Sequence, residues 1–145
     1  MMIEKDTVRL LRECDAGVKM GISSIDDVVK YVKSDALRER LEECRLAHKK
    51  LDTELQELLE RYRDDGKEPS AIAKGMSRIK TEMKLAMHES DHTIAELMTD
   101  GCNMGVKSLS KYLNQYRAAD EKSKDITKRL IAVEEELAVD IRPYL

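Results

Sequence analysis

Large aromatic side chains are nearly missing from this sequence, which has five Tyr and neither Phe nor Trp. Proline and glycine, the residues that most often interrupt helices, are also scarce, at two and six among 145 residues. Leu, Ile, Val, Met and Ala must therefore form the core, and strong helix formers dominate the remainder. The composition predicts an all-α protein with the length of a single domain, covering residues 1–145.

Long apolar runs and blocks of one charge are absent as well. The net charge is −3, the mean hydropathy is −0.55, and acidic and basic residues alternate along the chain. We expect no membrane association, because a spanning helix needs about 20 successive apolar residues. We also expect no nucleic-acid partner, because the chain lacks a basic patch with aromatic platforms. The first residues, 1–6, lack the apolar core of a signal peptide, so we expect a cytoplasmic protein.

The three cysteines, Cys14, Cys44 and Cys102, are an odd number and include no Cys-x-x-Cys spacing. This pattern is typical of reduced thiols in a cytoplasmic protein, and we expect no disulfide. A thiol-based redox sensor that uses Cys44 or Cys102 is one functional hypothesis. Its weakness is that a cysteine on an apolar helix stripe is more often inert packing than a nucleophile.

Four long segments carry apolar residues at every third or fourth position, which predicts amphipathic helices. These helices span about 4–33, 35–63, 90–117 and 121–143. We expect Ser34 or Asp35 to cap the second helix, a capping box from Thr93 to Glu96 to begin the third near Ser90, and Asp120 to cap the last. The most regular stripe lies on the second helix and consists of Leu37, Leu41, Cys44, His48, Leu51, Leu55, Leu58 and Tyr62.

The strongest break in the chain is the segment 64–70, which contains Gly66 and Pro69. After it, a shorter helix over about 70–87 carries a Met-rich stripe formed by Ile72, Met76, Ile79, Met83 and Met87. We expect this helix to carry the chain along the molecule as a crossover. The predicted order is therefore a helical hairpin over 4–64, a crossover helix over 70–87 and a second hairpin over 90–143.

A short motif occurs twice, as Cys14-Asp15-Ala16-Gly17-Val18-Lys19 and as Cys102-Asn103-Met104-Gly105-Val106-Lys107. An offset of 88 residues relates the two copies, and an offset of 89 aligns the stripes of the second and last helices. This pattern indicates an internal duplication of one hairpin. We expect the glycines to allow a close crossing of the first and third long helices, with Gly17 beside Gly105 and Gly21 beside Cys102.

The helix order, the Pro-containing break, the Met-rich connector and the Asp100-Gly101 pair resemble those of a bacterial ferritin-like four-helix-bundle family, a domain of unknown function. The resemblance implies a ferritin-like up-down four-helix bundle of two antiparallel hairpins with an extra short crossover helix. It also implies a history of metal binding. Ferritin-like di-iron sites use inward-facing Glu and Glu-x-x-His. We expect no Glu-x-x-His in this sequence, and the first helix offers Gly17 and Gly21 instead of a carboxylate.

His48 is the most informative polar residue on the stripes. In one interpretation it is a buried histidine that is hydrogen-bonded to Glu134 or Glu135 on the last helix. In the other, His48, Cys44 and Glu135 bind a single transition metal ion such as iron, manganese or zinc, because Cys44 lies one helical turn before His48.

His88 and His92 form a second candidate metal site, with Asp91 and Glu96 nearby. Residues four apart on one helix can bind zinc or nickel adventitiously. The pair lies at the predicted start of a helix, however, where solvated capping residues are more common than metal ligands.

Catalytic motifs, including phosphate-binding glycine loops and dinucleotide fingerprints, are absent. We therefore expect no catalytic residues and no cofactor, and the sequence identifies no small-molecule substrate. The favoured hypothesis is a non-catalytic structural or protein-interaction module, with a protein partner or self-association. The alternative is an atypical metal-binding ferritin-like protein centred on His48.

Overall fold

The computed structural model describes residues 2–145, apart from the side chains of residues 71–77 and 79. The described chain is helical, with short connections. Its elements are α1 (Met2–Val28), η1 (Val29–Tyr31), α2 (Asp35–Arg61), α3 (Ala71–Met87), α4 (Asp91–Gln115), α5 (Glu121–Asp140) and η2 (Arg142–Tyr144). No strand occurs in this part of the chain, which confirms the predicted all-α class.

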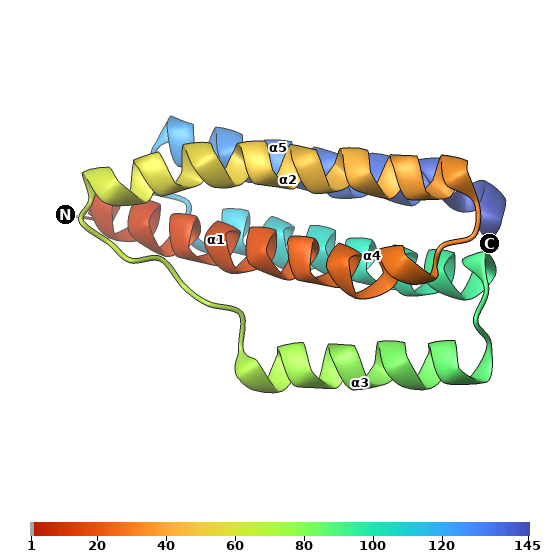
Figure 1. The fold of residues 1–145 in the computed structure, drawn as a ribbon. Helices are drawn as coiled ribbons and strands as arrows, with labels where there is room; N and C mark the ends of the chain where they lie inside the picture. Colours follow the sequence, from red (N-terminus) through yellow and green to blue (C-terminus); the bar gives the residue numbers. More distant parts are fainter. Residues whose placement is uncertain (1) are drawn as a thin grey trace.

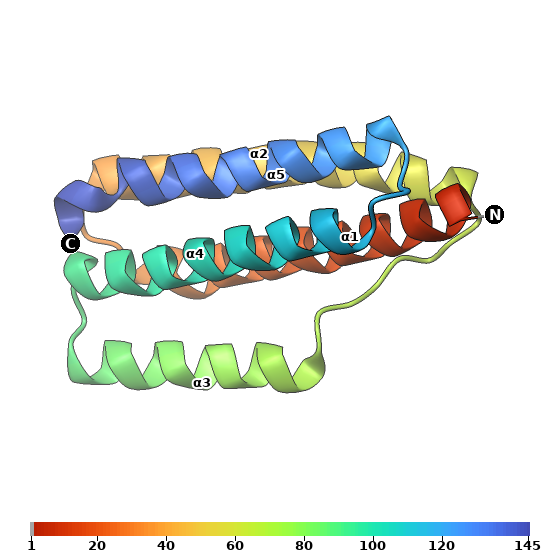
Figure 2. The ribbon, with the colours of Figure 1, turned by 180° about the vertical axis from the view of Figure 1, so that it is seen from behind.

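The helices pack as two antiparallel hairpins joined by α3 (Figure 1). Helices α1 and α2 form the first hairpin, and α4 and α5 form the second. Helix α1 lies beside α4, and α2 lies beside α5, so the four long helices enclose one interior (Figures 1 and 2). Helix α3 runs along the outer side of α1 and α4 and returns the chain to the end of the molecule where α1 finishes (Figure 1).

Polar side chains begin three of the helices by accepting a hydrogen bond from an otherwise unpaired backbone N–H. Ser34 accepts from the N–H of Leu37 at the start of α2, and Asp120 accepts from that of Ser123 at the start of α5, as predicted. Helix α4 differs from the prediction. Its cap is Ser90, which accepts from the N–H of Thr93, and the proposed capping box from Thr93 is wrong because Thr93 already lies inside the helix.

The apolar stripes of the four long helices form the core. The regular stripe of α2 is buried along its whole length except at Tyr62, which is half-buried. The largest fully buried side chains from these helices are Leu10, Leu11, Ile25, Leu37, Leu41, Leu55, Leu59, Ile94, Ile126, Leu130, Leu137 and Ile141. The stripe of α5 ends irregularly, because Asp140 is exposed and paired with Arg40 while Ile141 is buried instead.

Helix α1 continues without interruption through Gly17, Gly21 and the Ser23-Ser24 pair, since packing on both sides outweighs the low helix propensity of these residues. All three cysteines are free and buried, as expected for reduced thiols.

The Met-rich stripe of α3 is only partly described. Ile72, Met76 and Ile79 lie outside the described side chains. Met83 and Met87, the last two members of the stripe, are 61% and 74% exposed, so this end of the stripe is not part of the core. Leu85 is the buried residue of this turn and joins the core cluster near Ile94.

The segment between α2 and α3 is held to α1 by a buried carboxylate. Asp15 is fully buried and accepts hydrogen bonds from the backbone N–H of Lys67 (2.9 Å), the amide of Gln56 (2.8 Å) and the ammonium group of Lys19 (3.0 Å). Gly66 lies against this carboxylate with φ +81°, and a Cβ there would come 2.1 Å from Asp15 Oδ2. The position therefore requires glycine for both its backbone conformation and its lack of a side chain.

No described helix is both long enough and apolar enough to cross a membrane.

We predict that Asp15→Asn lowers the free energy of unfolding by about 2–4 kcal/mol, because three donors converge on the carboxylate and an amide turns its own donors toward them. Urea unfolding followed by far-UV circular dichroism measures the change. Asp26→Asn, on the same helix, is the matched control. Asp26 pairs with Arg45, but its side chain is 48% exposed, so we expect the free energy of unfolding to fall by less than about 1 kcal/mol. Equal losses in the two variants would contradict the role of Asp15.

Candidate functional site

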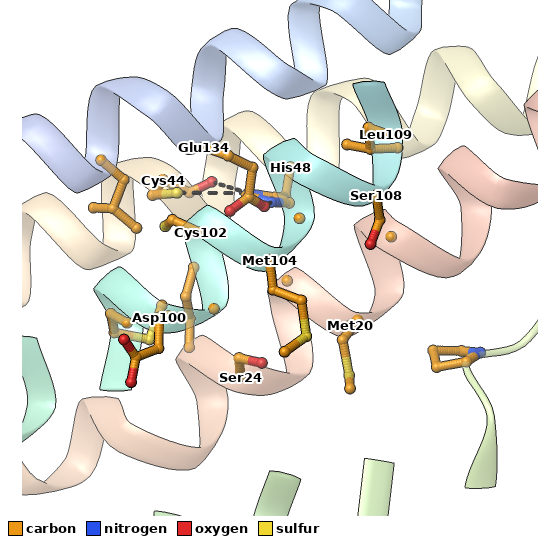
Figure 3. A pocket seen from close by; sticks show the side chains of 18 of the residues that line it. Met20, Ser24, Cys44, His48, Asp100, Cys102, Met104, Ser108, Leu109 and Glu134 are labelled. Atoms are coloured by element: carbon orange, nitrogen blue, oxygen red, sulfur yellow. Dashed lines mark hydrogen bonds and ion pairs between the residues drawn. The ribbon is translucent and has the colours of Figure 1, made fainter. Parts of the chain in front are cut away.

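A cavity of about 660 Å³ lies between α1 and α4 on the side that faces α3, and Lys80 and Thr81 of α3 also line it. Small residues on the two helices create the opening. They are Ala16, Gly17, Gly21 and Ser24 on α1, and Gly101, Gly105 and Ser108 on α4. The side chains of Met20 and Met104 stand at this opening (Figure 3). Because small side chains leave space between packed helices, a passage reaches from the surface toward the interior.

Four polar side chains from three helices form the inner end of the cavity. Cys44 and His48 come from α2, Cys102 comes from α4 and Glu134 comes from α5 (Figure 3). The His48 side chain is 1% exposed, and that of Glu134 is 12% exposed. The rest of the lining is mainly apolar, so these groups are the main polar feature of the interior.

Both ring nitrogens of His48 are engaged in hydrogen bonds. Nδ1 lies 2.8 Å from the carbonyl oxygen of Cys44, and Nε2 lies 2.9 Å from Oε1 of Glu134. A carbonyl oxygen only accepts, so Nδ1 carries a proton and donates it. An ionised carboxylate also only accepts, so Nε2–H donates to Glu134. The arrangement is therefore that of an imidazolium paired with a carboxylate. The Cys44 Sγ atom lies 3.6 Å from Nδ1.

The pKa of His48 reflects two opposed effects. Burial lowers the pKa, because it penalises the charged ring, but the interactions of the ring with Cys44 and Glu134 raise it by more. The net result raises the pKa of His48 to about 10. At neutral pH the ring is therefore charged and is neutralised by Glu134.

The thiols of Cys102 and Cys14 are held in the protonated form. Burial raises the pKa of Cys102, and the neighbouring carboxylate of Glu134 raises it further. Cys14 lies elsewhere in the core, where burial raises its pKa to about 12 although a hydrogen bond with Thr127 opposes the shift. Neither environment activates a cysteine as a nucleophile, because the reactive form is the thiolate.

Gly21 makes room for the His48 ring. A Cβ at Gly21 would lie 2.5 Å from Nε2 and 2.7 Å from Cδ2 of His48. A Cβ at Gly17 would instead make ordinary contacts with Leu130 (3.7 Å) and Leu109 (3.9 Å). The expected close crossing of two helix backbones at these glycines is therefore wrong, because side chains from the other helices and the cavity occupy the space beside them.

The predicted metal ligands are only partly brought together. His48 and Cys44 are adjacent, but Glu135 is exposed, and the hydrogen-bond partner of His48 is Glu134, the other residue considered. Within the described part of the chain, no three His, Cys, Asp or Glu side chains are arranged to hold a metal ion. The donor set does not fit a ferritin-type di-metal centre, because α1 supplies Gly17 and Gly21 there.

His88 and His92 do not share a helix. His88 follows the end of α3, whereas His92 lies in the first turn of α4 and pairs with Glu96 at 2.9 Å. The expectation of no Glu-x-x-His is wrong, because Glu89 and His92 have this spacing, although they lie off the apolar stripes. Both residues are exposed, and Glu89 precedes the helix, so neither points into the interior.

The cavity itself was not predicted from the sequence. The available signal was a shared spacing of small residues, with Gly17, Gly21 and Ser24 on one helix and Gly101, Gly105 and Ser108 on the other. Such a pattern also allows two helices to approach closely, so the sequence did not distinguish a tight crossing from an opening.

Comparisons with known proteins identify no relative. No protein-family model, no curated protein and no solved structure matches the chain.

We predict opposite effects from adding one methyl group at two glycines of α1. Gly21→Ala displaces the His48 ring and lowers the free energy of unfolding by about 1–3 kcal/mol, as expected for overpacking. Gly17→Ala is neutral or stabilises by up to about 1 kcal/mol, because its contacts are ordinary and Ala favours the helix. Urea unfolding of both variants tests this. Equal tolerance at both positions would contradict the assigned contact between Gly21 and His48.

We predict that the stability of the protein falls as pH rises from about 7 to 8.5. The folded state keeps a proton on His48 to a pKa of about 10, whereas the unfolded chain loses it near 6.5. The folded state therefore binds more protons in this window, and its free energy of unfolding decreases by at most about 1.4 kcal/mol per pH unit. The thiols contribute mainly above this range, because their unperturbed pKa is 9.0.

The matched variant is His48→Gln. We expect it to be less stable than the original protein at neutral pH, and its free energy of unfolding should not fall in the same way between pH 7 and 8.5. Thermal unfolding at several pH values measures both proteins. An equally steep decrease in the variant would show that another group is responsible.

Proposed function

We propose that this chain is a non-catalytic binding module that holds a small, largely apolar organic molecule in the cavity between α1 and α4. The single observation that carries the proposal is the cavity of about 660 Å³ with a buried His48–Glu134 pair at its inner end. Ligand sites in proteins have volumes of roughly 300–1,000 Å³, are mainly apolar and contain a few fixed polar groups. The size and the lining of this cavity both match that description.

The architecture proposed for the module is a ferritin-like four-helix bundle with α3 as its crossover helix, formed by duplication of one hairpin. The two antiparallel hairpins and the position of α3 support the bundle. Gly17 and Gly105, equivalent positions of the repeated motif, both line the cavity and support the duplication. The free, buried thiols are in keeping with a cytoplasmic location.

The chemistry of the interior supports binding rather than catalysis. His48 is a weak general base, because both ring nitrogens already carry engaged protons. Cys102 is a weak nucleophile, because its thiol is held protonated. A bound molecule would therefore meet fixed polar groups without an activated attacking group.

The second candidate function is transition-metal binding at His48. It is favoured by the contacts of this histidine with Cys44 and Glu134, since sulfur and imidazole donors suit zinc and other borderline metals, and it requires the metal to displace a ring proton of His48. Elemental analysis of protein purified without a histidine tag separates the two functions. Stoichiometric iron, manganese or zinc that is lost in His48→Ala would support the metal function instead.

We predict that 4-phenylbutan-1-ol binds saturably to the protein and that filling the mouth of the cavity weakens this binding. Gly101 lines the cavity, and a Cβ there would meet nothing within 4 Å. Gly101→Leu therefore occupies ligand space without a clash, and we expect at least about tenfold weaker binding from the lost apolar contact. Ligand-observed NMR titration provides the measurement.

The control is Asn103→Leu, which adds the same side chain at an exposed position of α4 that does not line the cavity. We expect its binding to equal that of the original protein. The absence of saturable binding, or equal weakening in both variants, would contradict the proposed function.

A further inference from the structure

The inner end of the cavity offers a hydrogen-bond acceptor but no imidazole donor. The two N–H groups of His48 are directed at the Cys44 carbonyl and at Oε1 of Glu134, so neither is available to a ligand. An anionic ligand would find no free N–H there and would also be repelled by the Glu134 carboxylate. Anions are therefore poor occupants of this site.

The Glu134 carboxylate lines the cavity, and its second oxygen, Oε2, is not used by His48; the other donor beside this carboxylate is the Cys102 thiol, which is a weak one. The hydrogen bond from His48 uses Oε1 of Glu134, and the Glu134 side chain keeps 12% of its surface exposed. Gly105 leaves this carboxylate uncovered, because a Cβ at that position would lie 3.7 Å from Oε2. An oxygen of an ionised carboxylate in an apolar cavity is stabilised by a donor, and most strongly by a charged one.

The other charged groups on the lining are already paired. Glu13 pairs with Lys67, and Lys80 lies 4.0 Å from Asp100 at the exposed mouth. The lining is therefore close to neutral and its walls are apolar, so the Glu134 carboxylate is the acceptor that a ligand meets at the inner end.

We propose that the natural ligand is an organic ammonium compound with an apolar body, whose ammonium group pairs with Oε2 of Glu134. This inference rests on the proposed function and names the chemical class that the cavity accepts. In this arrangement the apolar body lies between the methionines of the opening, Met20 and Met104 (Figure 3), and the ammonium group lies at the inner end, where Gly105 adjoins Glu134.

The test compares three probes that share one apolar skeleton: 4-phenylbutylamine, 4-phenylbutan-1-ol and 4-phenylbutanoate. We expect the amine, which is an ammonium at neutral pH, to bind at least about tenfold more tightly than the alcohol, because a charged hydrogen bond replaces a neutral one. The carboxylate should bind more weakly than the alcohol. Calorimetric or NMR titrations at equal ionic strength provide the three dissociation constants.

Glu134→Gln keeps the shape of the side chain and removes its charge. We expect this variant to lose the preference for the amine, so that amine and alcohol bind with similar affinity. Glu135→Gln, an exposed neighbour on the same helix, is the matched control and should keep the preference for the amine.

The outcomes separate the two proposals. If none of the probes binds, the proposed function fails. If the alcohol binds but the amine is no tighter, or the carboxylate is as tight, the ammonium inference is overturned while the binding function stands. A preference that survives in Glu134→Gln also overturns the inference. If that variant does not fold, the comparison of three probes on the unaltered protein decides.

Discussion

A hydrogen bond between two charged groups inside an apolar bundle, from His48 to Glu134, is the interaction on which the rest of the site depends. Neither charge is stable there alone, because desolvation of an unpaired ion costs several kcal/mol. The pair holds α2 against α5, and the backbone carbonyl of Cys44 fixes the ring on its other side. The orientation of the ring determines which polar atoms face the cavity.

The glycines of α1 and α4 follow from this constraint. Gly21 has no side chain because the His48 ring fills that space, and Gly105 leaves the Glu134 carboxylate uncovered. The cavity is thus the space left where α1 and α4 carry glycines beside the fixed pair of His48 and Glu134. Asp15 has a separate role. It holds the segment that leads to α3 against α1.

Much of the fold was predictable, because helix periodicity and capping are local properties. The stripe from Leu37 to Tyr62 identified the buried face of α2, and Ser34 and Asp120 were correctly identified as caps. The placement of His48 on that stripe also predicted a buried histidine near Glu134. The cavity could not be predicted, because glycines at such spacing fit either a close helix crossing or an opening. The side chains that face these glycines from the other helices decide between a close crossing and an opening.

The protonation state of His48 is the central claim of this account, since it determines that the cavity presents an acceptor rather than a donor. Nitrogen-15 NMR of the histidine side chains at about pH 7 reports it directly. The account predicts that both ring nitrogens of His48 are protonated, with slow hydrogen exchange because the ring is buried. A neutral ring with one unprotonated nitrogen would contradict it.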